Sequence, residues 1–304
     1  MPKPRRVATS TAIGAAGVTG ASVGFLAGQT LLARLRIGSL KVNPPSPDGL
    51  YGEHLDGPPV RLLVLGDSVA VGYGLYHAEQ TPSALLASGL SELLGNPVDV
   101  RSVAVVGAKS ADLDDQVDRG LSFAPHVALI VIGANDVTHL KHQGRAVERL
   151  QGAIRRLVAI NTEVVVGTCP DLGTIRPFAE PLRSVARVQS RRMAMKQTIG
   201  AVEAGARTIS LGSVLGVLFT VHHELMFGAD RFHPSASGYA AFSNALLPVL
   251  ADAVHERRSE PPEERPGQTE DLMPMVEAAE AAAAHSGTEV RRAGRWAGVL
   301  HRRR

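Results

Sequence analysis

The segment Arg61-Leu62-Leu63-Val64-Leu65-Gly66-Asp67-Ser68 joins a continuous apolar run to a glycine and then to two polar residues. Such a run is typical of a strand that is buried on both faces, as in a parallel sheet. Ser68 lies three residues past Leu65, where the next helix should begin. Because ligands collect beyond the carboxyl ends of parallel strands, this segment predicts both a strand of the central layer and one edge of a binding site.

Four further apolar runs also predict strands, and the stretches between them have helical spacing. The expected strands cover residues 61–65, 98–105, 126–132, 163–166 and 207–211. The expected helices cover residues 82–94, 111–121, 145–160, 182–204 and 236–254. This alternation predicts an α/β fold, a three-layer α/β/α sandwich around a mostly parallel sheet of about five strands.

Composition narrows the class of partner. The 304 residues are 44% apolar, enough for one well-buried domain of about 200 residues. The formal net charge is +3, and no basic stripe with interleaved aromatic residues crosses the central region, so we expect no nucleic-acid partner. Cys169 is the only cysteine, which excludes an internal disulfide. Its position after an apolar run is typical of a buried thiol.

A serine, a histidine and an aspartate have the spacing that nucleophilic catalysis needs. A serine hydroxyl is a poor nucleophile unless a base removes its proton. Asp230 and His233 are three residues apart, just before Pro234. This spacing lets the carboxylate accept the imidazole Nδ1–H while Nε2 faces Ser68. Alone, Ser68 could be a helix N-cap and Asp230-x-x-His233 a surface pair; together they predict attack on an acyl carbon.

Two further strand ends offer hydrogen-bond donors for an oxyanion. Gly107 follows the second predicted strand, and Asn135 follows the third within Gly133-Ala134-Asn135-Asp136. A glycine N–H and an asparagine amide can both stabilise the negative charge that develops on the substrate oxygen. Each residue alone is as well explained by a turn. The convergence of three consecutive strand ends favours a functional site.

These blocks together resemble the SGNH hydrolases, also called GDSL lipases and esterases, over residues 60–254. The resemblance implies a flavodoxin-like α/β/α sandwich and hydrolysis through an acyl-enzyme, without a cofactor or a metal ion. It assigns Ser68 as nucleophile, His233 as base and Asp230 as the acid that orients it. It also implies an oxyanion hole formed by Ser68, Gly107 and Asn135. The whole chain is similar to exported mycobacterial-type GDSL esterases of actinobacteria.

The blocks depart from the family pattern at two places. Val69 stands where the family name has leucine. Ala104-Val105-Val106 precedes Gly107, where the family commonly has an asparagine. The hydrogen bonds of that asparagine must therefore come from elsewhere or be absent.

From these residues we expect a serine esterase that acts on carboxylic esters of short to medium acyl chain length. An acyltransferase or a deacetylase that acts on envelope sugars or lipids is the alternative within the enzyme class. A catalytically silent envelope binding protein is the alternative outside it. Tyr76, Phe178, Phe219 and Phe227 are candidates to line an acyl site, although core packing explains each equally well.

The first 40 residues predict an N-terminal signal anchor or signal peptide. Lys3, Arg5 and Arg6 precede the uncharged residues 7–33, a stretch long enough to cross a hydrocarbon core of about 30 Å. An uncleaved anchor, a cleaved export signal and a soluble helix are all compatible with it. We expect association with the membrane through this segment, and a location outside the cytoplasmic membrane or in the cell envelope.

The remaining boundaries follow from composition. Residues 41–59 predict an extended linker, residues 60–255 the catalytic domain, and residues 256–304 a largely disordered charged tail. Within the tail, residues 275–285 and 291–300 could form short helices.

Two other groups of polar residues are weaker candidates for a site. His139, His142, His222 and His223 lack a carboxylate or cysteine that would complete a metal site. Asp67 is expected to orient or support the site rather than to serve as the triad acid.

Overall fold

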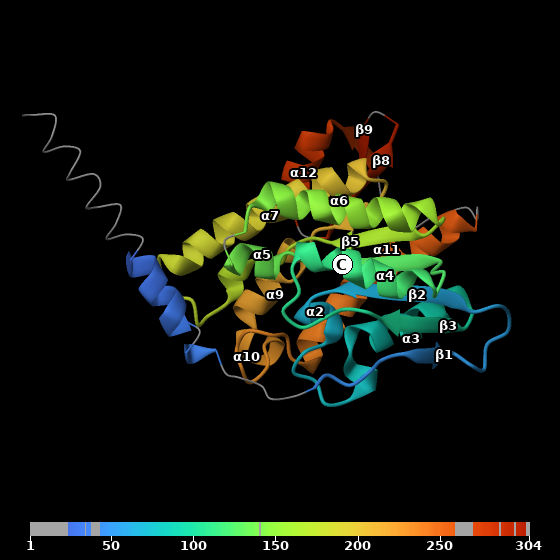
Figure 1. Cartoon of the computed structure of the whole chain (residues 1–304), viewed down its shortest axis with the longest axis horizontal. Helices are drawn as coiled ribbons and strands as arrows, with labels where there is room; N and C mark the ends of the chain where they lie inside the picture. The colour runs from blue at the N-terminus through green and yellow to red at the C-terminus, as the bar shows by residue number, and fades with distance from the viewer. Residues whose placement is uncertain are drawn as a thin grey trace, which may run out of the picture.

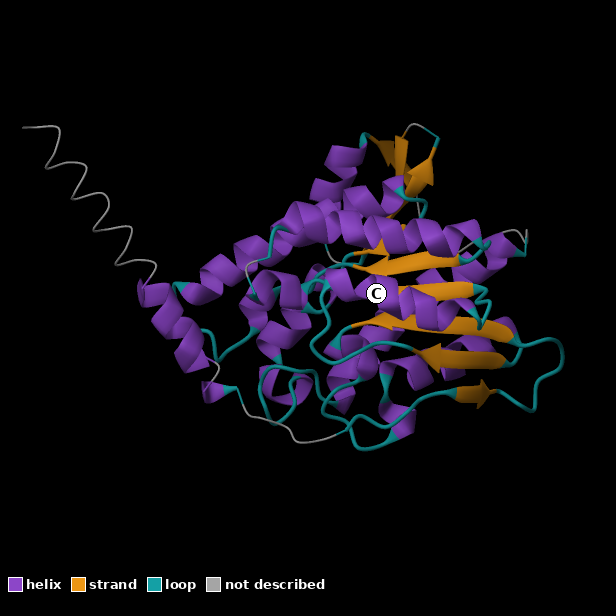
Figure 2. Cartoon of the chain, in the orientation of Figure 1, coloured by secondary structure: helices purple, strands orange, loops and turns teal. Residues whose placement is uncertain are grey.

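The computed structural model describes residues 24–33, 35–37, 43–139, 141–258, 270–285, 287–294 and 296–301. The strands are β1 (Gly49–Tyr51), β2 (Val60–Gly66), β3 (Val98–Ser102), β4 (Val127–Val131), β5 (Glu163–Gly167), β6 (Arg207–Ile209), β7 (Glu270–Met273), β8 (Thr288–Ala293) and β9 (Trp296–His301). The longer helices are α3 (Pro82–Leu94), α4 (Leu113–Leu121), α6 (Gln143–Ala159), α7 (Leu182–Glu203), α11 (Ala236–Arg257) and α12 (Met275–Ala284). Figures 1 and 2 show the strands side by side, with helices on both faces.

Short helices fill the loops around one end of the sheet. They are α2 (Ser68–Val71), α5 (Ala134–Thr138), α8 (Leu211–Val214), α9 (Gly216–Val221) and α10 (His223–Met226). The described residues also form the 3₁₀ turns η1 (Ala78–Gln80), η2 (Ser110–Asp112) and η3 (Leu172–Thr174).

The strands form one sheet in the order β1-β3-β2-β4-β5-β6-β8-β9-β7. The five central strands, β3-β2-β4-β5-β6, are parallel to one another. The chain moves from β2 to one side to form β3, and then returns to the other side to form β4. Ligands bind at such a reversal of strand order, outside the carboxyl ends of the strands. Ser68, Gly107 and Asn135 all follow strands at this reversal.

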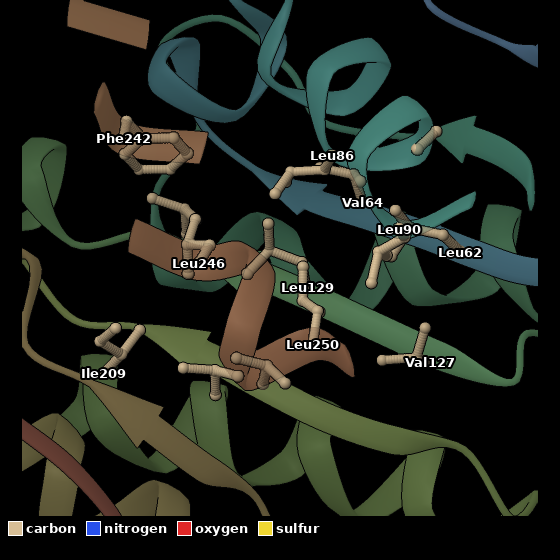
Figure 3. Packing of buried hydrophobic residues seen from close by; sticks show 14 of the residues in the cluster. Leu62, Val64, Leu86, Leu90, Val127, Leu129, Ile209, Phe242, Leu246 and Leu250 are labelled. Atoms are coloured by element: carbon tan, nitrogen blue, oxygen red, sulfur yellow. The ribbon is translucent and has the colours of Figure 1, made fainter. Parts of the chain in front are cut away.

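Side chains of the central strands alternate between two cores because successive residues of a strand point to opposite faces. Leu62 and Val64 of β2 pack with α3 and α11, where Leu86, Leu90 and Leu246 are fully buried (Figure 3). The intervening Leu63 and Leu65 pack on the other face, with residues of α4 and α6. The predicted α/β/α sandwich is therefore confirmed, with its parallel centre buried on both sides.

The sheet is larger than the five strands that the sequence predicts. Within the expected linker, β1 pairs antiparallel with β3. In the expected disordered tail, β8 pairs with β6, β9 with β8, and β7 with β9, all antiparallel. Residues 291–300, expected to be helical, belong to β8 and β9 and to the turn between them, where Gly294 has a φ of +61°. Of the expected disordered tail, residues 259–269 lie outside the described residues.

The C-terminal strands are stable because they bury their own small core. Val290, Ala297 and Val299 are fully buried against Ala278 of α12 and Val202 of α7.

A network of ion pairs joins β8 to the parallel part of the sheet. Arg207 of β6 forms ion pairs with Glu289 of β8, at 3.3 Å, and with Glu256 of α11. Arg291 forms a further pair with Glu256 at 2.6 Å, so that the network joins β6, α11 and β8.

The N-terminal helix lies against the beginning of α7. Residues 24–33 are helical, and the Gln29 side chain donates to the Glu180 carbonyl oxygen at 2.6 Å and accepts from the Leu182 N–H at 3.1 Å. Ala33 is buried there. Among the residues that the structure describes, no helix is both long enough and apolar enough to span a membrane. Residues 7–23 of the expected anchor lie outside the described residues.

Candidate active site

Ser68 is held at the end of β2 by a turn that only glycine can make. Gly66 has a φ of +142°, and a Cβ atom there would lie 2.0 Å from the carbonyl oxygen of Val131 on the neighbouring strand. Asp67 then caps α2, because its Oδ1 accepts the Val69 N–H at 3.0 Å. Ser68 is therefore the first residue of a short helix, where its N–H has no acceptor within the helix.

Gln116 of α4 clamps the same turn from the opposite core. Its Oε1 accepts the Gly66 N–H at 2.7 Å, and its Nε2 donates to the Gly66 carbonyl oxygen at 2.9 Å. The side chain is fully buried. Gln116 was not among the predicted site residues. A signal for it exists in the sequence, since it is polar but lies on the buried stripe of α4 with Leu113, Val117 and Gly120.

Ser68, His233 and Asp230 form one hydrogen-bonded chain. His233 Nε2 lies 3.0 Å from Ser68 Oγ, and His233 Nδ1 lies 2.6 Å from Asp230 Oδ2. Asp230 Oδ1 accepts the N–H groups of Phe232 and His233 at 2.9 and 3.0 Å. Both carboxylate oxygens are thus fixed. Asp230 is 1% exposed, while the His233 side chain is 13% exposed.

The loop that carries Asp230 and His233 is closed on itself. The Gly228 N–H donates to the His233 carbonyl oxygen at 2.8 Å, and Phe227 pairs with Pro234 in an isolated bridge. The Tyr73 ring meets the His233 imidazole edge to face, with centroids 4.7 Å apart. These contacts hold the imidazole in the orientation that reaches Ser68.

Two carboxyl groups near Ser68 have opposite pKa shifts. Burial disfavours the Asp230 carboxylate, but the hydrogen bonds from His233 and Phe232 outweigh burial and lower its pKa. Burial raises the pKa of Asp67 to about 7, against the lowering effects of the Val69 N–H and of His233. Asp230 is therefore the ionised partner of His233, whereas Asp67 retains its proton up to near neutral pH.

Gly107 and Asn135 lie on loops that contact each other. Asn135 Nδ2 donates to the carbonyl oxygen of Ala108 at 3.0 Å, which fixes the asparagine beside the loop that contains Gly107. Gly107 has a φ of +81°, and a Cβ atom there would meet nothing within 4 Å. Its N–H donates to no acceptor among the described residues. Asn135 lines the same cavity as Ser68, but Gly107 does not.

Asp136 holds the end of this loop, and Gln197 joins the segments that follow β4 and β5. Asp136 Oδ2 accepts both the N–H and the hydroxyl of Ser110, at 3.0 and 2.9 Å. Gln197 of α7 donates to the Ile132 carbonyl oxygen at 2.8 Å and accepts the Cys169 N–H at 2.7 Å. Like Gln116, Asp136 and Gln197 were not predicted as supporting residues. Cys169 is buried and unbonded to another cysteine, as expected.

An apolar cavity of about 70 Å³ opens at Ser68 and His233. Its walls come from the ends of β4 and β5, from α8 and α9, and from the loop around His233. The apolar residues that line it include Val131, Leu172, Ile175, Leu211, Leu215, Phe219, Phe227, Phe232 and Phe242. Of the four expected acyl-site candidates, Phe219 and Phe227 line this cavity, Phe178 is buried outside it, and Tyr76 is 71% exposed.

Comparison with known proteins defines the class of this site. The GDSL-like Lipase/Acylhydrolase family model matches residues 64–241. The chain therefore belongs to this family and is a carboxylic ester hydrolase.

One curated relative is the GDSL-like esterase Rv1075c of Mycobacterium tuberculosis, which is 39% identical over 285 residues. That match covers 88% of this chain and 90% of the relative. Among solved structures, TesA is 20% identical and covers 65% of this chain and 97% of its own, with a TM-score of 0.47. A lipase/acylhydrolase from Enterococcus faecalis is 18% identical and covers 68% and 100%, with a TM-score of 0.46.

Proposed function

We propose that this protein is a serine esterase in which Ser68 is the nucleophile, His233 the general base and Asp230 the orienting acid. The observation that carries this proposal is the continuous hydrogen-bonded chain from Asp230 through His233 to Ser68. Serine becomes nucleophilic only when such a base removes its proton during attack. The expected three-residue spacing of Asp230 and His233 produces this geometry within one closed loop.

The reaction follows from the positions of these atoms. His233 Nε2 takes the proton of Ser68 Oγ while Oγ attacks the ester carbonyl carbon, and Asp230 stabilises the imidazolium that results. When the tetrahedral intermediate collapses, the C–O bond to the alcohol breaks and His233 returns the proton to the departing oxygen. Water, deprotonated by His233, then attacks the acyl carbon. The bond from this carbon to Ser68 Oγ breaks as His233 returns the proton to Oγ, and the acid is released.

The oxyanion is expected to receive donors from three strand ends. A side-chain amide has two N–H donors. One N–H of Asn135 is held by Ala108, which leaves the other for the substrate oxygen. The N–H groups of Ser68 and Gly107 complete the proposed hole. Each such donor typically contributes about 100- to 1,000-fold in rate.

The apolar cavity favours short to medium acyl chains. A cavity needs about 10–15 Å³ to hold one water-sized group, so the 70 Å³ cavity beside Ser68 has room for on the order of five such groups. We therefore infer an optimum at acyl chains of about four to six carbons. Esters with much longer chains should be poorer substrates, because the chain exceeds the cavity.

The test is hydrolysis of p-nitrophenyl butyrate by the wild type and by Ser68→Ala. The variant should lose at least about 1,000-fold in kcat, because the nucleophile is absent. Ser88→Ala is the matched control, since Ser88 is exposed on α3 and is not part of the cavity lining. Retained activity in a folded Ser68→Ala protein contradicts the mechanism. Failure of the wild type to label with a fluorophosphonate probe would instead support the catalytically silent binding protein.

We also propose that the chain is exported and associates with the membrane through its N-terminal segment. The basic residues Lys3, Arg5 and Arg6 followed by an uncharged stretch support this proposal. Within the described part of that segment, Phe25 and Leu31 are 59% and 62% exposed. Cell fractionation of the full chain tests it. Recovery of the protein only in the cytosolic fraction would refute it.

A further inference from the structure

A second cavity lies behind one wall of the acyl cavity. It has a volume of about 430 Å³ and is lined by Arg176, His223, Glu224, Phe227, Gly228, Ala229 and Arg231. Phe227 lines both cavities. Arg231 stands between Asp230 and His233 in the chain. The second cavity is therefore adjacent to the reacting groups but has a different chemical character.

The lining of this cavity carries an excess of positive charge. Arg176 and Arg231 are both exposed, and neither guanidinium forms an ion pair among the described residues. Arg176 uses one N–H to bind the Thr220 carbonyl oxygen at 3.2 Å, which orients its fork. Glu224 is the one carboxylate in the described lining, and it lies 4.0 Å from His223 with 93% of its side chain exposed.

The backbone at Arg231 adds an independent argument. Arg231 has a φ of +58° in the turn closed by its N–H on the Gly228 carbonyl oxygen at 2.9 Å. Glycine or asparagine adopts this conformation at lower cost, by about 1 kcal/mol for glycine. The turn itself therefore does not require an arginine. Residues held in costly conformations cluster where their side chains have a function.

We propose that Arg176 and Arg231 bind an anionic group of the ester substrate, a carboxylate or a phosphate, in the cavity beyond Phe227. Guanidinium groups match both anions with paired hydrogen bonds. The inference rests on the proposed function, because it places this group on the same molecule whose ester carbonyl reaches Ser68. The anion belongs either to the far end of the acyl chain or to the alcohol, and both sources present the same chemistry to the arginines.

Two matched pairs of esters distinguish the sources. For the acyl side, the p-nitrophenyl monoester of glutaric acid is compared with p-nitrophenyl pentanoate. For the alcohol side, the butyryl ester of 4-hydroxybenzoate is compared with that of 4-hydroxybenzamide. In one pair the anionic ester should have a kcat/KM about 3- to 10-fold higher than its neutral partner, as expected for exposed charge-assisted contacts. High salt should reduce this ratio through screening.

Arg176→Gln and Arg231→Gln should each lower the ratio of anionic to neutral kcat/KM, and the double variant should bring it close to one. Arg155→Gln removes the same charge from an exposed position on α6 outside both cavities and should leave the ratio unchanged. The absence of a preference in both pairs overturns the proposal, as does a preference that persists in the double variant. Either result leaves the proposed function intact if the neutral esters are hydrolysed by the wild type and not by Ser68→Ala.

Discussion

Replacing Gln116 with methionine should destabilise the fold and slow the reaction through the same two hydrogen bonds. Methionine has a similar length and fits an apolar core. It cannot, however, accept the Gly66 N–H at 2.7 Å or donate to the Gly66 carbonyl oxygen at 2.9 Å. The buried Gly66 N–H would then lose its acceptor, whereas the Gly66 carbonyl oxygen would keep the Val105 N–H at 3.1 Å. Gly66 cannot move away easily, because its surroundings leave no space even for a Cβ atom.

The expected loss of stability follows from the burial of the Gly66 backbone. A buried backbone group that loses its partner costs about 1–3 kcal/mol, so the loss of the Gly66 N–H acceptor should lower the free energy of unfolding by about this amount. Gly66 directly precedes Asp67 and Ser68, so a shift of this turn also displaces Ser68, the proposed nucleophile. A misplacement of this kind can lower kcat by about 10- to 100-fold. KM should change less than kcat, since most of the cavity lining lies on other loops.

Urea unfolding and steady-state kinetics of the same protein sample measure both effects. Gln151→Met is the control, because Gln151 makes its hydrogen bonds at the half-exposed contact of α6 with α7. We expect the control to lose less than about 1 kcal/mol and to keep its kcat. The reasoning is refuted if Gln116→Met unfolds within about 0.5 kcal/mol of the wild type and retains full activity.

Three further predictions concern the buried Asp67 carboxyl group, the size of the cavity beside Ser68, and the buried ion pair of Arg207. The pKa of Asp67 is higher in the folded state than in the unfolded state, so the folded state holds this proton more tightly. The stabilising contribution of Asp67 to folding is therefore complete below pH 4 and is lost as the pH rises to about 7. The free energy of unfolding of the wild type should therefore fall by about 2–3 kcal/mol between pH 5 and 8, and Asp67→Asn should abolish this fall. An equal change in the two proteins, measured by urea unfolding at both pH values, would contradict this. Leu215→Ala widens the acyl cavity and should move the chain-length optimum upward by about two carbons, as measured over a series of p-nitrophenyl esters; an unchanged optimum would show that Leu215 does not limit the chain. Arg207→Met removes the guanidinium that pairs with the buried Glu289 and should lower the free energy of unfolding by about 3–5 kcal/mol. The double variant Arg207→Met, Glu289→Gln should recover much of this stability. An equal loss in both variants would mean that the buried charge is not the cause.

The central layers could be predicted from the sequence because their signals are local. Helix α3 begins and ends at the predicted residues, since Thr81 caps it, Pro82 occupies its first position, and Gly95 ends it in the left-handed conformation. The short polar block after β2 identifies Ser68 as a candidate, and the Asp-x-x-His-Pro spacing before α11 identifies Asp230 and His233. A parallel sheet brings the ends of β2, β3 and β4 together, so the proximity of Ser68, Gly107 and Asn135 follows from the fold class.

The supporting residues could not be predicted in the same way because their partners are backbone atoms far along the chain. Gln116 bonds Gly66, 50 residues away, and Gln197 bonds Ile132, 65 residues away. The C-terminal strands were missed for a different reason. Residues 288–293 contain Glu289, Arg291 and Arg292, which by composition indicate a solvated segment. In the fold, Glu289 and Arg291 find ionic partners in Arg207 and Glu256.

The pairing of β6 with β8 has a consequence for how this enzyme is made. Arg207 and Glu289 are 82 residues apart, so the ribosome has synthesised every residue of the proposed triad well before the strand that covers β6. During that interval β6 presents unpaired N–H and C=O groups, which are a template for pairing with another nascent chain. A chain that ends after Arg258 would contain the whole proposed triad and yet keep this open edge. Its defect should therefore appear first as a lower soluble yield at expression, before any change in the chemistry at Ser68.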